Sequence, residues 1–149
     1  MKERGELTGD ERTELTGDKR ARILLVEDDK GRCAWFRSRF SGRQMDVTCD
    51  VREAIRWLET RDYGLIFLDH DLTAHNYEQI AFNYKEEEDM TGYRVACWLA
   101  EHADRQREAT IIVHSLNYVG AQRMIQLLQD AGFDAEYIPF TILISGLRY

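Results

Sequence analysis

The chain has 149 residues, of which 44% are hydrophobic and 32% charged, and its net charge is −7. This size and apolar content are typical of one globular domain and exclude a wholly disordered chain. The acidic balance argues against duplex nucleic acid as a partner, because its backbone requires a basic surface. No apolar run approaches the ~20 residues of a membrane span, so we expect no membrane partner.

Three cysteines, Cys33, Cys49 and Cys97, are scattered along the chain without CxxC spacing. An odd number without close pairs argues against a disulfide framework and against a zinc site. We therefore interpret them as buried thiols and expect a cytoplasmic protein.

The first 22 residues differ from the rest in composition. They contain the repeated words ELTGDER and ELTGDKR, and their acidic and basic residues balance. Because apolar side chains are nearly absent, this segment cannot bury enough surface to offset its ordering entropy. We predict a flexible tail over 1–22; a short peptide that binds a partner is the alternative.

After this tail, apolar runs and helical patterns alternate. Residues 23–26 (ILLV) form a continuous apolar run, as expected of a strand buried on both faces. A helical pattern follows over 33–40, and 45–49 form a weaker strand. Asp50 and Glu53 form a capping box for a second helix.

The second half of the chain continues this alternation. Residues 65–68 (LIFL) and 111–113 (IIV) predict two further buried strands. Apolar positions over 121–128 predict a helix that ends at Gly132, and a last strand is expected over 135–138.

Strands that alternate with helices predict an α/β fold. Parallel strands need crossover helices, and these crossovers are right-handed. We therefore predict a doubly wound, five-stranded parallel sheet of flavodoxin-like type with strand order 2-1-3-4-5. The domain is placed at 23–140, with a short C-terminal tail over 141–149. A long insert at 73–91 is either disordered or a lid over the strand ends.

Carboxylates follow the predicted strands. Glu27 and Asp28 come directly after the first strand and Asp69 after the third, while Ser115 lies just beyond the fourth. In open parallel sheets, ligands bind at the carboxyl ends of the strands. Three carboxylates crowded there predict a divalent-cation pocket in which Asp69 can act as a nucleophile; the alternative is that the acids cap helices at the solvent.

The segments ILLVEDD (23–29) and LIFLD (65–69) resemble the receiver domains of two-component response regulators. Ser115 after the fourth strand and the Pro-Phe pair after the fifth strand resemble them too. The resemblance implies that Glu27 and Asp28 bind Mg²⁺, with the backbone carbonyl of Asp71 as a further metal ligand. It also implies that Asp69 is the phosphoacceptor and that Ser115 senses the phosphoryl group.

One position departs from that family. Receivers carry a lysine directly before the proline that follows the fifth strand, whereas this chain has Ile138-Pro139. Because that lysine contacts the phosphoryl group, the departure implies impaired phosphorelay signalling.

Four other words resemble the receiver-like family predicted to process cyclic phosphates: LDHDL (68–72), TGY (91–93), HSLN (114–117) and GAQRM (120–124). This resemblance implies a metal-assisted phosphoesterase that hydrolyses a cyclic phosphate or a nucleotide phosphoester.

Two histidines and two donors suit that chemistry. Histidine transfers protons near neutral pH, so we predict His70 and His114 as the acid–base pair, acting with Asp69. Ser115 and Asn117 are predicted to donate to phosphate oxygens. Because side chains alternate along a strand, the histidines either meet beside the acidic pocket or pack separately as core residues.

We therefore predict a domain that hydrolyses a cyclic phosphate or nucleotide end with Mg²⁺ or Mn²⁺, held by Glu27, Asp28, Asp69 and Asp71. The alternative is an atypical receiver that binds partner proteins, with phosphorylation of Asp69 impaired. A scaffold in which neither site works is the third possibility.

Overall fold

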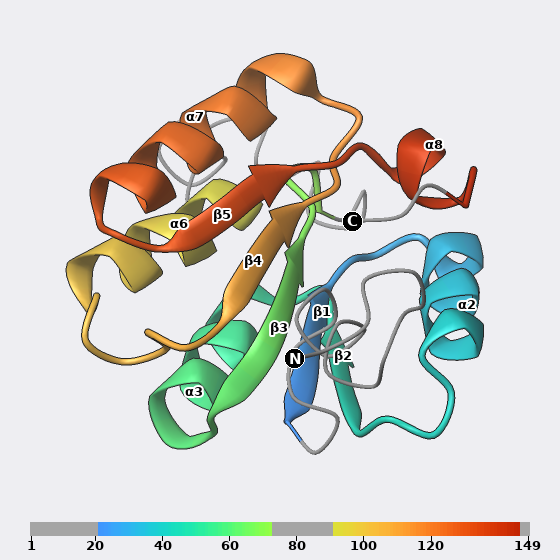
Figure 1. Ribbon diagram of the computed structural model, residues 1–149, viewed down its shortest axis with the longest axis horizontal. Coiled ribbons are helices and arrows are strands. Elements are labelled where there is room, and N and C mark those ends of the chain that lie inside the picture. The colour runs from blue at the N-terminus through green and yellow to red at the C-terminus, as the bar shows by residue number, and fades with distance from the viewer. Residues whose placement is uncertain (1–20, 73–90, 147–149) are drawn as a thin grey trace, which may run out of the picture.

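The computed structural model describes residues 21–72 and 91–146. Strands and helices alternate along these residues, as predicted (Figure 1). The elements are β1 (Arg22–Val26), α2 (Lys30–Arg39), β2 (Met45–Thr48), α3 (Val51–Thr60), β3 (Tyr63–Leu68), α6 (Gly92–Glu101), β4 (Thr110–Val113), α7 (Tyr118–Asp130), β5 (Asp134–Tyr137) and α8 (Phe140–Leu143). None of the helices described here has the length and apolar character needed to cross a membrane.

The strands form one parallel sheet in the order β2-β1-β3-β4-β5. The predicted α/β fold and its strand order are therefore confirmed. Nearly all of the predicted tail at 1–22 and of the insert at 73–91 lies outside the described residues, and α8 begins one residue before the predicted C-terminal tail.

One half of the predicted capping box is present, and the other differs: the Asp50 backbone N–H donates to Thr48 Oγ1 (3.0 Å) and not to Glu53. The Asp50 side chain accepts hydrogen bonds from the backbone N–H groups of Arg52 (2.9 Å) and Glu53 (3.4 Å), which starts α3. Gly132 follows α7 with φ +97°, a left-handed conformation that glycine adopts without steric cost.

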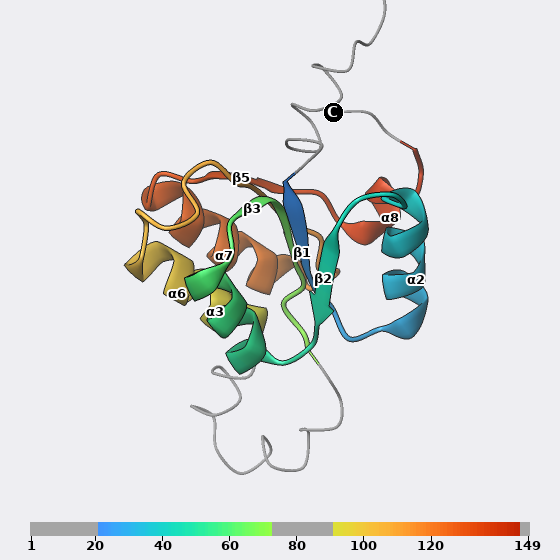
Figure 2. The same ribbon diagram turned by 90° about the horizontal axis from the view of Figure 1, so that it is seen from below.

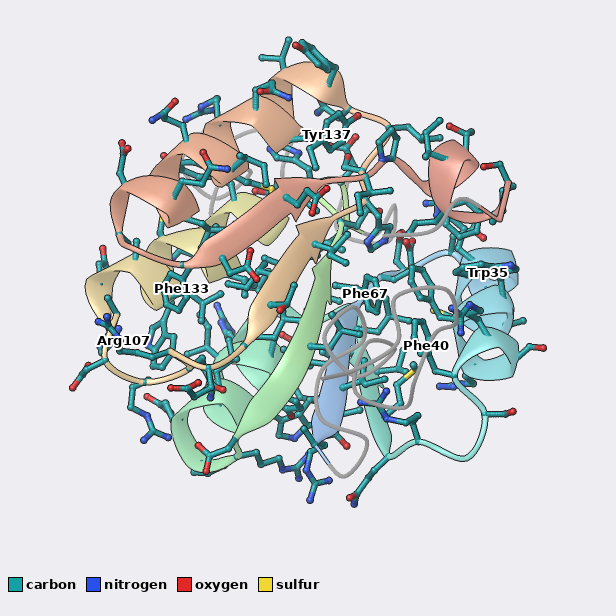
Figure 3. All side chains as sticks on the ribbon, in the orientation of Figure 1. Trp35, Phe40, Phe67, Arg107, Phe133 and Tyr137 are labelled. Carbon is teal, nitrogen blue, oxygen red and sulfur yellow. The ribbon has the colours of Figure 1, made fainter. Side chains whose placement is uncertain are left out.

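Helices cover both faces of the sheet, so the domain has two apolar cores (Figure 2). Because side chains alternate along each strand, Leu24 and Ile66 pack under α3, α6 and α7, whereas Leu25 and Phe67 face α2 and α8. The labelled Phe40 and Phe67 lie together between the sheet and α2, with ring centroids 5.4 Å apart (Figure 3). Both cores end at the carboxyl ends of the strands.

Candidate functional site

Four polar side chains are buried at the carboxyl ends of neighbouring strands. Glu27 follows β1, Asp69 follows β3, and His114 and Ser115 follow β4; each is at most 4% exposed. Backbone bonds continue the sheet past the strands: Asp69 N donates to the Val26 carbonyl, and His114 N donates to the Leu68 carbonyl, both at 3.0 Å. The predicted meeting of strand ends therefore occurs at β1, β3 and β4.

Glu27 is the centre of a hydrogen-bond network. Its Oε1 accepts from His114 Nε2 (2.7 Å) and from Arg32 Nε (3.1 Å), and its Oε2 accepts from Arg32 Nη2 (3.0 Å). The backbone N–H groups of Asp28 and Asp29 also donate to Oε2. Burial by itself raises the pKa of Glu27, but hydrogen bonds from His114 and Arg32 outweigh it and lower the pKa to about 2.

His114 is 1% exposed and packs against the Phe36 ring, with centroids 5.0 Å apart. Burial lowers its pKa, against the opposing effect of Glu27. The imidazole is therefore neutral and donates from Nε2 to the carboxylate, while its Nδ1 has no hydrogen-bond partner among the described residues.

Asp69 differs sharply from Glu27. Its Oδ1 accepts from the backbone N–H of His70 (2.8 Å), its Oδ2 lies 3.6 Å from Arg32 Nη2, and its carboxyl group is hydrogen-bonded to the Ser115 side chain. Burial and the neighbouring Glu27 carboxylate raise the pKa of Asp69 to about 7, in spite of Arg32 and these hydrogen bonds. This carboxyl group therefore changes charge near neutral pH.

His70 belongs to a second group of polar residues, at the start of α7. Its Nδ1 lies 2.8 Å from Oδ1 of the exposed Asp71, which also accepts from Asn117 Nδ2 at 3.2 Å. Asn117 Oδ1 caps α7 by accepting from Gly120 N (2.9 Å). The carboxylate of Asp71 thus orients the His70 ring.

Two glycines allow these groups to pack closely. A Cβ at Gly92, the first residue of α6, would overlap the backbone carbonyl oxygen of Asp69. A Cβ at Gly120 would lie 2.5 Å from His70 Cδ2. The words TGY and GAQRM of the sequence therefore include the two positions where helices approach Asp69 and His70.

The two predicted catalytic histidines have different partners. His114 is held by Glu27 inside the α2 core, and His70 is held by Asp71 at the α7 N-terminus. Their action as one acid–base pair stays a prediction.

The acidic cluster is present, with a composition that differs from the predicted ligand set. Ligand atoms of Glu27, Asp69 and His114 lie within 4.8 Å of one another; within residues 21–72 and 91–146, no other three His, Cys, Asp or Glu side chains meet this spacing. Asp28 is outside the group, and the Asp71 carboxylate faces His70 and Asn117. Since Arg32 contacts both Glu27 and Asp69, this arrangement does not fit a divalent cation while the guanidinium is in place.

Sequence reasoning missed Arg32, which lies five residues after Glu27 in the first turn of α2. The sequence feature that could have indicated its role is a basic residue in the first helical turn after a strand that ends in an acidic residue. At the usual lysine position, Ile138 is 3% exposed and is part of the apolar core under α2 and α8.

Residues 22–130 match the family described as the cyclic-phosphate processing receiver domain. The chain belongs to this family. Among curated proteins, none matches the sequence.

Solved structures share the fold of this cyclic-phosphate processing receiver domain. A CheY-like response regulator receiver domain from Methanospirillum hungatei JF-1 is 20% identical, with a TM-score of 0.55 over 85% of this chain and 90% of its own. The receiver domain of sensor histidine kinase PA1611 from Pseudomonas aeruginosa PAO1, solved with magnesium in its active-site cleft, is 21% identical, with a TM-score of 0.55 over 80% of this chain and 84% of its own. Response regulator TrrA from Thermotoga maritima, in complex with Mg²⁺-BeF, is 17% identical, with a TM-score of 0.55 over 80% and 85% of the two chains. These similarities establish the receiver fold.

Proposed function

We propose that this domain binds a cyclic phosphodiester, such as a nucleoside 2′,3′-cyclic phosphate, at the carboxyl ends of β3 and β4 and opens it by hydrolysis. The observation that carries the proposal is the position of Asp69. Its carboxyl group is buried with a pKa of about 7, contacts Arg32 and Ser115, and precedes His70 in the chain. A pKa near the working pH suits general acid–base chemistry.

In this proposal Asp69 is the general base. Its carboxylate takes a proton from water as the water oxygen attacks phosphorus, and the bond between phosphorus and one ring oxygen breaks. His70, oriented through Nδ1 by Asp71, gives a proton to the departing oxygen. The product is a phosphate monoester with a free hydroxyl group.

Other residues bind or position. The Arg32 guanidinium donates to non-bridging phosphate oxygens, which offsets the charge that develops there. The Ser115 hydroxyl has one proton, so its donation to phosphate requires it to turn away from the Asp69 carboxylate. Asn117 holds Asp71 and thereby His70, and its direct donation to phosphate stays a prediction. His114 positions Glu27 and through it Arg32.

The Mg²⁺ or Mn²⁺ predicted from the sequence is not part of this proposal. An ion held by Glu27 needs oxygens that Arg32 and His114 occupy, so no step above passes through a metal.

The test is hydrolysis of nucleoside 2′,3′-cyclic phosphates by the full chain and by matched variants. We expect Asp69→Asn and His70→Gln each to lower kcat/KM by about 100-fold or more, as loss of a general acid or base does. His102→Gln is the control, because His102 caps α6 and stacks on Trp98. His114→Gln is expected to shift the pH profile and retain turnover.

Absence of turnover by the folded wild-type chain contradicts the proposal. Equal rates for His70→Gln and His102→Gln contradict the role of His70.

A second candidate is a receiver that docks a protein partner, with Asp69 as phosphoacceptor. The observation that favours it is a row of exposed apolar side chains directly after Ser115: Leu116 (57% exposed), Tyr118 (63%) and Val119 (69%). Beryllofluoride is then expected to change the oligomeric state, measured by light scattering, in wild type and not in Asp69→Asn. Identical behaviour of the two proteins excludes this candidate.

A further inference from the structure

We infer that the Arg32 guanidinium is the resident cation of the cluster formed by Glu27, Asp69 and His114, and takes the position between Glu27 and Asp69 that a divalent metal ion would occupy. The wild-type domain is then metal-independent at this site. The inference concerns cation occupancy, so it holds whether or not the pocket hydrolyses a phosphoester.

One guanidinium nitrogen bridges both carboxylates. Arg32 Nη2 lies 3.0 Å from Glu27 Oε2 and 3.6 Å from Asp69 Oδ2, while Nε donates to Glu27 Oε1 at 3.1 Å. The two carboxylate side chains are 0% and 6% exposed. A paired, bidentate guanidinium is the strongest cationic partner that a protein side chain offers to a buried carboxylate.

Both carboxylate oxygens of Glu27 already accept two or more hydrogen bonds. Oε1 accepts from Arg32 and from His114 Nε2 (2.7 Å), and Oε2 accepts from Arg32 and from two backbone N–H groups at 3.1 and 3.0 Å. Because His114 Nε2 carries the proton that it donates, this nitrogen has no lone pair for a metal. A metal ion can therefore bind Glu27 only if Arg32 leaves.

The location of Arg32 in α2 supports a role set by the pocket. Arg32 is in the first turn, where the helix dipole disfavours a positive charge, and that turn contains no acidic residue. Local helix preference therefore opposes an arginine here. The contacts with Glu27 and Asp69 compensate for it, and the Phe140 ring lies 5.9 Å from the guanidinium carbon.

The charge of Arg32 determines how strongly a divalent ion can bind beside Glu27 and Asp69. With Arg32 present, a divalent ion entering beside Glu27 and Asp69 meets a fixed positive charge about 3 to 4 Å from its ligands. With glutamine at that position, the Glu27 carboxylate and the buried Asp69 carboxyl group face each other without a cation. Crowded carboxyl oxygens of this kind favour a hard divalent ion.

The experiment measures Mn²⁺ binding to the full chain by electron paramagnetic resonance of the free ion. Arg32→Gln is expected to bind Mn²⁺ at least about tenfold more tightly than wild type. Arg32→Lys keeps the charge and stays close to wild type. Arg37→Gln removes the same charge from the exposed end of α2 and also stays at the wild-type level.

Equal Mn²⁺ affinity of wild type and Arg32→Gln overturns the inference, provided that circular dichroism shows both to be folded. If Arg32→Gln does not fold, the thermal stability of the wild-type protein with and without Mg²⁺ tests the inference. Millimolar Mg²⁺ is then expected to leave its Tm unchanged, and a rise in Tm, as an ion bound to the native state produces, overturns the inference.

Discussion

Glu27 and Asp69 are both buried and have ligand atoms within 4.8 Å of each other, yet their pKa values differ widely. The pKa of Glu27 is about 2, whereas that of Asp69 is about 7. Hydrogen bonds from His114 and Arg32 stabilise the charge on Glu27, and that charge in turn raises the pKa of its neighbour. The pocket therefore keeps one permanent carboxylate and one carboxyl group that titrates near neutrality.

Asp69→Asn is expected to stabilise the domain at high pH. The pKa of Asp69 is raised from 3.8 to about 7 in the folded state, so the folded protein binds more protons between these values. Wild-type stability therefore falls as the pH rises through this window. Asparagine removes the buried charge, so we expect a gain of about 2 kcal/mol in the free energy of unfolding at pH 8.

Urea unfolding at pH 8 and pH 4 in metal-free buffer measures this difference, which is expected to shrink at the lower pH. The exposed Asp104, changed to Asn, is the control and should show no such pH dependence. An Asp69→Asn protein equally or less stable than wild type at both pH values contradicts the prediction.

At the scale of the elements, the start of α6 is placed by direct contact with the end of β3. Gly92 N donates to the His70 carbonyl at 2.8 Å, and Thr91 caps the helix by accepting from Tyr93 N at 3.2 Å. A side chain at residue 92 would occupy the space of the Asp69 carbonyl oxygen. Because backbone atoms cannot move aside as a flexible side chain can, this contact determines how closely α6 approaches the end of β3.

Gly92→Ala is expected to lower the free energy of unfolding by at least about 2 kcal/mol, because backbone must move to admit the methyl group. Gly31→Ala is the matched control, since its Cβ would lie 3.2 Å from the Asp29 side chain near the start of α2. Thermal unfolding compares the two. A smaller loss at Gly92 than at Gly31 contradicts the argument.

At the scale of the whole molecule, the acidic cluster adjoins the apolar core under α2, where the His114 ring packs against Phe36. The α2 core contains Ile138, 3% exposed, at the position where the resemblance to receivers predicts a lysine. The cation of the site comes instead from Arg32 at the start of α2. In this chain the positive charge that contacts Glu27 and Asp69 therefore comes from the β1 side of the sheet.

Ile138→Lys is expected to destabilise the domain by about 3 kcal/mol, because it places an ammonium group among apolar side chains. Ile138→Met conserves the volume and is expected to lose less than about 1.5 kcal/mol. Urea unfolding measures both. If the lysine variant is as stable as the methionine variant, the position tolerates the charge and the interpretation of Ile138 is wrong.

The two-sided burial of β1, β3 and β4 and the α3 N-cap could be predicted because each depends on local sequence, whereas the strand order was predicted from the alternation of strands and helices and the doubly wound fold type. Runs such as 65–68 are apolar throughout only where helices cover both faces of a sheet. The same reasoning placed Glu27, Asp69 and Ser115 at one edge of the sheet. It could not assign a partner to each of them, since hydrogen-bond partners depend on side-chain directions across three strands and a helix.

By itself, the sequence predicted an α/β fold with acidic and hydroxyl groups at the ends of its strands, because periodicity and chain order indicate both; the receiver family was predicted from the resemblance of its motifs. Only the tertiary structure decided that Arg32 pairs with Glu27 and that the two histidines have separate partners. The physical reason is that burial makes each pairing nearly obligatory, while which groups meet depends on how α2 and α7 pack against the sheet.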